Sequence, residues 1–164
     1  MIDPRPVGYV IGLLVATLGG MMLFPMALDW SAGDPNWMAF LESAVVCLAF
    51  GSMLAMACAN RAGRGLTLQQ SFLLTTGVWV ALPVFGALPF VIGAPDASAT
   101  DAIFEAVSGM TTTGTTAFSG LDALPMGTNL WRGILQWLGG LGIVIVAMIF
   151  LPVKPASPVG PPIT

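Results

Sequence analysis

The stretch that decides the fold reads DAIFEAVSGMTTTGTT and occupies residues 101–116. Its first part, Asp101–Met110, has the pattern of a short amphipathic helix, and Ser98 just before it is a residue type that caps helix starts. Ten residues of helix reach only about 15 Å, half of the hydrocarbon core of a bilayer. The second part, Thr111–Thr116, is small and polar. We therefore predict that the connection Gly93–Asn129 re-enters the membrane, with a half-length helix going in and an extended segment returning.

The sequence on either side is that of a membrane protein. Of 164 residues, 56% are hydrophobic and 8% are charged, whereas a soluble domain carries about 25% charged residues. A helix needs about 20 apolar residues to cross a bilayer, and four stretches are long enough: Val7–Leu28, Trp37–Ala59, Ser71–Ile92 and Gly133–Leu151. The first is too long for a signal-peptide core, so we interpret it as a retained helix. The fold class predicted is an all-α polytopic membrane protein.

The charged residues predict how the chain is oriented. The basic residues of the N-terminus, the second connection and the C-terminal tail fall on one side of the spans: Arg5, Arg61, Arg64 and Lys154. The acidic residues of the first and third connections fall on the other: Asp29, Asp34, Asp96, Asp101, Glu105 and Asp122. Because Lys and Arg are in excess in cytoplasmic loops, both termini are expected in the cytoplasm. Tryptophans near the outer ends are expected to be interfacial anchors: Trp30, Trp37, Trp131 and Trp137.

The residues after the half-length helix have the chemistry of a cation pathway. A helix whose C-terminus points into the membrane directs partial negative charge there, which favours a cation. Successive carbonyls of an extended segment can replace the water shell of an ion, and Gly114 supplies the one residue that adopts positive φ without a Cβ clash. The outer acidic residues add a negative vestibule. The alternative is that Thr111–Thr116 is a plain extracellular linker of small polar residues.

Two charged residues admit two interpretations each. Glu42 lies about one turn inside the second span, where a carboxylate is costly, and it either extends toward the outer surface or makes a functional polar contact. Arg132 either pairs with Asp122 or Glu105 or is an interfacial anchor. Neither residue is assigned a role from the sequence.

Backbone-shaping residues within the spans are easier to interpret. Pro83 and Pro89 are expected to kink the third span. Gly8 and Gly12, four residues apart, permit close approach of another helix.

The residue types exclude most catalytic chemistry. The chain has no histidine and two cysteines, Cys47 and Cys58, which lie about 16 Å apart along one helix and therefore cannot form a disulfide with each other. No serine–lysine dyad or pair of carboxylates falls within the spans. We therefore expect a protein that is not an enzyme.

The sequence also resembles a known family. The likeness is carried by residues 101–116, by SGLD at 119–122 and by LWRGILQWLGGLGI at 130–143, with further matches in QSFLLTT at 70–76 and FGALPF at 85–90. These runs are similar to the Trk-type potassium uptake proteins, the TrkH members of the Trk/Ktr/HKT superfamily. The resemblance covers residues 1 to about 153.

The resemblance implies a fold and a set of binding residues. Family members place four helix–pore loop–helix repeats around a central pore, and the TrkH type has two extra helices in front. Residues 1–66 would then be the two-helix extension and residues 67–153 the first repeat, while the proline-rich residues 154–164 are expected to be disordered. The implied selectivity-filter residues are Thr111, Thr112, Thr113, Gly114 and Thr115. Among them, Thr112 and Thr113 are the implied main-chain ligands of K⁺.

The implied function is potassium transport across the bacterial inner membrane, with K⁺ as the transported ion and no cofactor. The implied partners are membrane lipid, the remaining pore repeats, a second copy in a homodimer of the full-length form, and a cytosolic nucleotide-binding regulatory subunit, with no nucleic acid. Family members continue into further repeats after a leucine-proline like Leu151-Pro152, so we expect a truncated or fragmentary form. The alternative is a non-conducting structural or regulatory subunit that associates with full-length partners.

Overall fold

The computed structural model describes residues 3–59 and 66–150, which form helices joined by loops. The predicted all-α class is confirmed for these residues. In chain order the elements are α1 (Arg5–Met21), α2 (Leu23–Ala32), α3 (Trp37–Cys58), α4 (Leu68–Gly86), α5 (Leu88–Ile92), α6 (Ala99–Met110), the 3-10 helix η2 (Leu121–Ala123) and α7 (Met126–Phe150).

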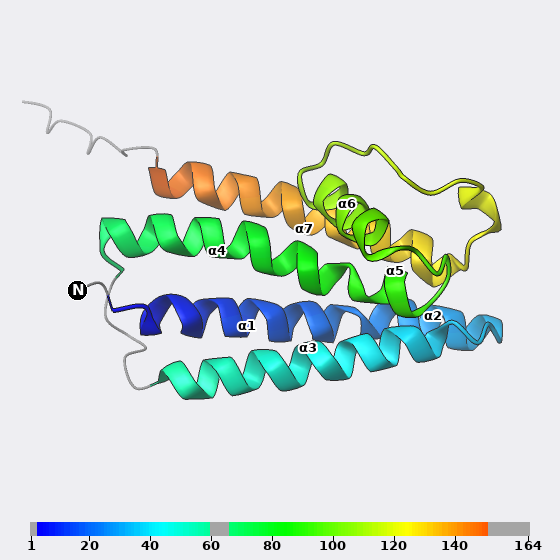
Figure 1. The fold of residues 1–164 in the computed structure, drawn as a ribbon, viewed down its shortest axis with the longest axis horizontal. Helices are drawn as coiled ribbons and strands as arrows, with labels where there is room; N and C mark the ends of the chain where they lie inside the picture. The colour runs from blue at the N-terminus through cyan, green and yellow to red at the C-terminus, as the bar shows by residue number, and fades with distance from the viewer. Residues whose placement is uncertain (1–2, 60–65, 151–164) are drawn as a thin grey trace, which may run out of the picture.

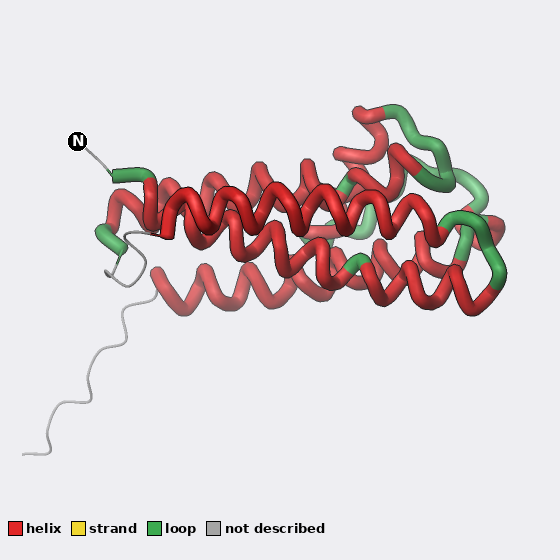
Figure 2. The backbone as a smooth tube through the Cα atoms, turned by 90° about the horizontal axis from the view of Figure 1, so that it is seen from below, coloured by secondary structure: helices red, strands yellow, loops and turns green. Residues whose placement is uncertain are grey.

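The long helices lie side by side in an elongated bundle and alternate in direction (Figure 1). The connections α2–α3, α5–α6 and η2–α7 gather at one end of the bundle, whereas α1 and α4 begin at the other, as Figure 2 also shows. We call the end with the three connections the outer end. It carries the predicted outer-side acidic residues.

Three of the predicted spans are confirmed as helices long and apolar enough to cross a membrane. They are Arg5–Ala32, Trp37–Cys58 and Leu68–Ile92. The fourth corresponds to α7, which begins at Met126 rather than at the predicted Gly133. The hydropathic pattern missed this first part because Gly-Thr-Asn and Arg132 are poor markers of a membrane helix.

Helices α1 and α3 make the most intimate contact in the bundle, and small residues allow it. A Cβ added at Gly12 would lie 2.6 Å from the Ala55 nitrogen, and one added at Gly51 would lie 2.6 Å from the Gly12 carbonyl oxygen. A Cβ at Gly8 would lie 2.8 Å from the sulfur of Cys58, which is a free cysteine. The predicted packing role of Gly8 and Gly12 is therefore confirmed, because neither position has room for a side chain.

The third span is interrupted near its outer end. Helix α4 continues through Pro83 to Gly86, and α5 starts again at Leu88 with Pro89 in its first turn. Since Pro89 has no backbone N–H and its ring crowds the preceding turn, the regular ladder cannot continue past it. The expected distortion at Pro89 is thus confirmed as an interruption of the span, whereas α4 continues through Pro83.

This interruption explains the position of Trp131. The amide of Phe90 donates to Ala87, and the carbonyl of Gly86 instead accepts a hydrogen bond of 2.9 Å from the indole N–H of Trp131. The ring of Trp131 is fully buried and packs edge-on against Phe40 at 6.3 Å. The expected role of Trp131 as an interfacial anchor is therefore wrong: it is a core residue that joins α7 to α4 and α3.

Candidate functional site

Helix α6 packs against α7, α4 and α5 near the outer end of the bundle. The Ser98 hydroxyl accepts a hydrogen bond of 3.2 Å from the Asp101 amide and donates one of 2.8 Å to the Asp101 carboxylate, which fixes the start of the helix. The helix ends at Met110, as predicted. Figure 1 shows that α6 lies against only part of α7 and that the chain then runs back to the outer end.

The contact between α6 and α7 depends on the absence of side chains. A Cβ added at Gly139 would overlap the carbonyl oxygen of Met110, the last residue of α6. A Cβ added at Gly109 would lie 3.1 Å from the Cβ of Leu135. The end of α6 is therefore held against the backbone of α7, which fixes the depth at which the following loop begins.

The first residues of the loop turn back on the last turn of α6. The amides of Thr111, Thr112 and Thr113 donate to the carbonyls of Val107, Gly109 and Ser108 at 2.8, 2.9 and 3.0 Å. These bonds pair carbonyls that the end of a helix would otherwise leave without a donor.

Two residues of the loop have left-handed backbone conformation. Gly114 has φ of 75°, which confirms the positive φ predicted there, and Thr112 has φ of 56°. The expectation that the whole of Thr111–Thr116 is extended is wrong for its first two residues, because they complete the turn that ends α6.

The five predicted filter residues are exposed. They differ in whether their backbone carbonyl accepts a hydrogen bond. Within the described part of the chain, no hydrogen bond reaches the carbonyls of Thr111–Gly114. The carbonyl of Thr115 instead accepts one of 2.5 Å from the hydroxyl of Ser108. Four successive carbonyls thus remain available to an ion, whereas the fifth is tied to α6.

Glu105 is the polar centre that joins the loop to both helices. It is 4% exposed, and its carboxylate accepts hydrogen bonds from Arg132 Nε at 2.6 Å, the Thr116 hydroxyl at 2.9 Å and the Ala117 amide at 3.0 Å. Of the alternatives for Arg132, the structure therefore shows the pair with Glu105 and not the pair with Asp122. Buried carboxylates are tolerated when they are paired and hydrogen-bonded in this way.

A second buried carboxylate ties the first two helices to the rest. Asp29 of α2 is fully buried and accepts a hydrogen bond of 2.6 Å from the Gly127 amide in the first turn of α7. It also accepts one of 2.8 Å from the side-chain amide of Asn36, which itself accepts one of 2.8 Å from the Ala94 amide. An anion at this position also complements the positive end of the α7 dipole.

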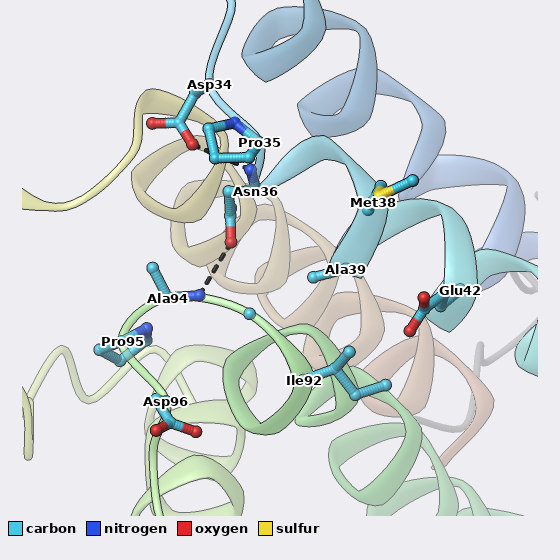
Figure 3. A pocket seen from close by; sticks show the side chains of 11 residues that line it. Asp34, Pro35, Asn36, Met38, Ala39, Glu42, Ile92, Ala94, Pro95 and Asp96 are labelled. Atoms are coloured by element: carbon cyan, nitrogen blue, oxygen red, sulfur yellow. Dashed lines mark hydrogen bonds between the residues drawn. The ribbon is translucent and has the colours of Figure 1, made fainter.

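The predicted negative vestibule therefore needs correction. Asp29 and Glu105 do not face open water, since both are buried and bonded to donors. Asp34, Glu42 and Asp96 do line an open groove at the outer end, between the start of α3 and the α5–α6 loop (Figure 3). Glu42 is exposed there.

The sequence contains a signal for the residues that pattern reasoning missed. Glu105 and Ser108 are three residues apart and share the face of α6 that also carries Ala102 and Gly109. Polar groups on the buried face of a helix require hydrogen-bond partners. This rule predicts partners for both side chains, although not that Thr115, Thr116 and Ala117 supply them.

Comparison with known proteins shows consistent similarity to one family. The family model described as TrkH, cation transport protein, matches residues 36–155. The chain is 40% identical over 151 residues to the Trk system potassium uptake protein TrkH of Escherichia coli K12, covering 91% of this chain and 31% of that protein. It is 39% identical over 147 residues to the Trk system potassium uptake protein TrkI of Halomonas elongata, covering 90% and 30%.

A solved structure has the same fold. The crystal structure of the potassium transporter TrkH from Vibrio parahaemolyticus superposes with a TM-score of 0.86 at 36% sequence identity. The match covers 93% of this chain and 32% of that chain. The chain thus spans about a third of the length of the proteins it resembles.

Proposed function

The chain belongs to the TrkH family of cation transport proteins, and from this membership we propose that it supplies the first pore-loop repeat of a potassium uptake protein. In this proposal residues 1–66 are an extension, residues 67–153 are the repeat, and Thr111–Thr115 are one strand of the selectivity filter. The observation that carries the proposal is that the four successive carbonyls of Thr111–Gly114, at the end of α6, accept no hydrogen bond from the described residues.

Elementary chemistry connects this geometry to K⁺. A cation that leaves water needs oxygen ligands on all sides, and backbone carbonyls in a row can provide them. The C-terminal end of α6 adds partial negative charge at the same place. Thr112 and Thr113 are the proposed main-chain ligands, and one such strand forms one wall of the pathway. The remaining walls come from the other repeats, and K⁺ is cargo rather than a cofactor.

The proposed setting is the bacterial inner membrane with both termini in the cytoplasm. The distribution of charge supports this orientation, since Asp34 and Asp96 lie in connections at one end of the bundle while Arg5 lies at the other. We further propose, from the family resemblance, a homodimer of the full-length form and a cytosolic nucleotide-binding regulatory subunit as partners.

A hybrid transporter tests the proposal. Residues 1–150 replace the matching segment of the Escherichia coli relative, and the hybrid is expressed in a bacterium that lacks its own potassium uptake. We expect growth at low potassium. Replacement of Gly114 by serine adds a Cβ at a residue with φ of 75°, at a cost of about 1 kcal/mol or more, and should turn a carbonyl and lower the preference for K⁺ over Na⁺.

Gly120→Ser is the matched control. Gly120 lies in the same connection, also has positive φ (67°), and has no atom within 4 Å of an added Cβ. It therefore carries the same kind of backbone strain outside the four carbonyls, and its variant should keep normal selectivity. A hybrid that fails to transport, or Gly114→Ser with unchanged selectivity, would contradict the proposal.

A further inference from the structure

The two carboxylate oxygens of Glu105 contact two different parts of the protein. Oε1 accepts the 2.6 Å hydrogen bond from Arg132 Nε in α7. Oε2 accepts the bonds from the Thr116 hydroxyl and the Ala117 amide, which belong to the returning segment of the loop. The side chain of Glu105 is 3% exposed, so solvent does not substitute for either set of donors.

The second set of contacts lies at the place where the loop leaves the candidate filter. Thr116 directly follows Thr115, whose carbonyl is held by Ser108 one turn beyond Glu105 on α6. At its other end, the loop is held by the amide bonds from Thr111 and Thr112 to the last turn of α6. The amides of Thr113 and Gly114 also donate to the carbonyl of Ser108, so the stretch with unpaired carbonyls is held to α6 along its length. Glu105 and Ser108 hold the residues that follow it.

We propose that Glu105 is a positioning residue for cation selection, in which Oε2 sets the position of the returning segment while Oε1 secures α6 to α7. This proposal rests on the proposed function, because it assigns Glu105 to the same filter. Oε2 bonds to the two residues after Thr115, so its loss releases the returning segment even where the helices stay packed.

The chemistry of the two oxygens provides a way to separate their roles. Glutamine at position 105 offers one acceptor and one donor. When the amide oxygen of this glutamine faces Ala117, its NH₂ group faces the Nε–H of Arg132, and two donors oppose each other. When the amide group is rotated by 180°, its oxygen accepts from Arg132 and the hydrogen bond with the Ala117 amide is lost. Glu105→Gln should therefore disturb the loop, the pair with α7, or both.

Substitution at position 132 completes the set. The terminal amide of glutamine lies at the same distance along the side chain as the Nε of arginine, which is the atom that bonds Glu105. In Arg132→Gln, the new NH₂ can still donate to Oε1, and Oε2 keeps its contacts with Thr116 and Ala117. In the double variant, the amide oxygen of the glutamine at position 132 can accept a hydrogen bond from the NH₂ group of the glutamine at position 105. The amide oxygen at position 105 then remains free to accept from the Ala117 amide.

The experiment measures uptake of rubidium and sodium by the hybrid transporter, together with the amount of protein in the membrane. We expect Glu105→Gln to lower the selectivity ratio about tenfold, as for loss of one charged hydrogen bond. Arg132→Gln leaves the buried Glu105 carboxylate without a counter-charge and should reduce the amount of protein, while the protein that inserts keeps a ratio close to the unmodified one. The double variant should recover most of the loss in selectivity. Asp122→Asn, at an acidic residue of the same connection that is exposed, is the control and should have no effect.

The pattern of results distinguishes a filter role from a purely structural one. If Glu105→Gln is absent from the membrane, the double variant, which has no unpaired buried charge, decides the question. The inference is wrong if Glu105→Gln only reduces the amount of protein and keeps its selectivity, or if the double variant inserts normally and remains as unselective as the single one. If Gly114→Ser changes selectivity and no Glu105 variant does, this inference fails while the proposed function stands.

Discussion

At the scale of single residues, the pair formed by Trp131 and Gly86 shows how one helix break determines a side chain elsewhere. Pro89 ends the regular ladder of the third span, and the carbonyl of Gly86 then needs a donor within the core. The indole N–H of Trp131 is that donor, and it acts from a residue that is fully buried. Tryptophan is suited to this position because it combines a large apolar ring with one donor.

Replacement of Trp131 by phenylalanine tests this pairing. The variant keeps an aromatic ring and leaves the buried Gly86 carbonyl without a donor, which should destabilise the protein by about 1–3 kcal/mol. The measurement is the thermal unfolding temperature of the hybrid transporter in detergent. Trp137→Phe is the control, since Trp137 is 60% exposed and its replacement should leave the unfolding temperature nearly unchanged. Equal unfolding temperatures for the two variants would show that the hydrogen bond does not stabilise the fold.

Single-residue features differ in how far the sequence predicts them. The positive φ of Gly114 is a local requirement of a tight backbone path, and local requirements select residue types that are easy to recognise. The partner of Trp131 is 45 residues away, and a tryptophan near a membrane interface has the same sequence pattern whether it faces lipid or the core. The ion pair of Arg132 with Glu105 was one of two pairs compatible with the sequence, and the packing of α6 on α7 selects it.

At the scale of helices, two of the helix pairs pack with their backbones in direct contact at glycines. Helix α1 contacts α3 at Gly12 and Gly51, and α6 contacts α7 at Gly139. Apolar side chains gain little by contacting one another in place of lipid, so helices in membranes associate through tight packing between small residues. The glycines are therefore determinants of which helices become neighbours.

Two substitutions in α1 separate packing from intrinsic helix preference. Gly12→Leu places a side chain where even a Cβ would lie 2.6 Å from the Ala55 nitrogen, so α1 and α3 must separate. Gly20→Leu is the matched control on the same helix, because no atom lies within 4 Å of its added Cβ. We expect Gly12→Leu to abolish accumulation of the folded hybrid and Gly20→Leu to be tolerated, as measured by size-exclusion chromatography in detergent. Normal accumulation of Gly12→Leu would show that the contact is dispensable.

The helices themselves were largely predictable, and their interruptions were less so. Long apolar runs mark the spans because every backbone group in lipid must be paired within a helix. The break between α1 and α2 at Met22 and the early start of α7 at Met126 were missed. At the start of α7, the amide of Gly127 donates to the buried carboxylate of Asp29, which belongs to α2. The hydropathy of the α7 segment alone contains no information about this contact with another helix.

At the scale of the whole molecule, the proposed filter strand would form only part of an ion pathway. The carbonyls of Thr111–Gly114 belong to exposed residues and lie on one side of any ion that they contact, while a dehydrated cation needs ligands from all directions. The loop also carries unpaired backbone groups that would face lipid in a lone copy, at several kcal/mol each. A pathway requires further walls that cover this face.

We therefore expect residues 1–164 expressed alone not to support potassium uptake. The measurement is growth at low potassium of a bacterium that lacks potassium uptake systems, with the hybrid transporter as positive control. Membrane fractions probed for the chain establish whether it accumulates. Robust growth with residues 1–164 alone would mean that copies of this one repeat close a pore together.

The bonds made by Asp29 and Asn36 also bear on how this protein can be taken apart and recombined. The proposed repeat begins at residue 67, yet the amides of Gly127 and Ala94 donate to side chains that precede it. A repeat grafted from residue 67 onward into a transporter whose own extension lacks these two side chains would leave both amides without acceptors and the start of α7 without its anion. The smallest transplantable unit therefore begins upstream of Asp29, and protein engineers who shuffle such repeats should move the junction accordingly.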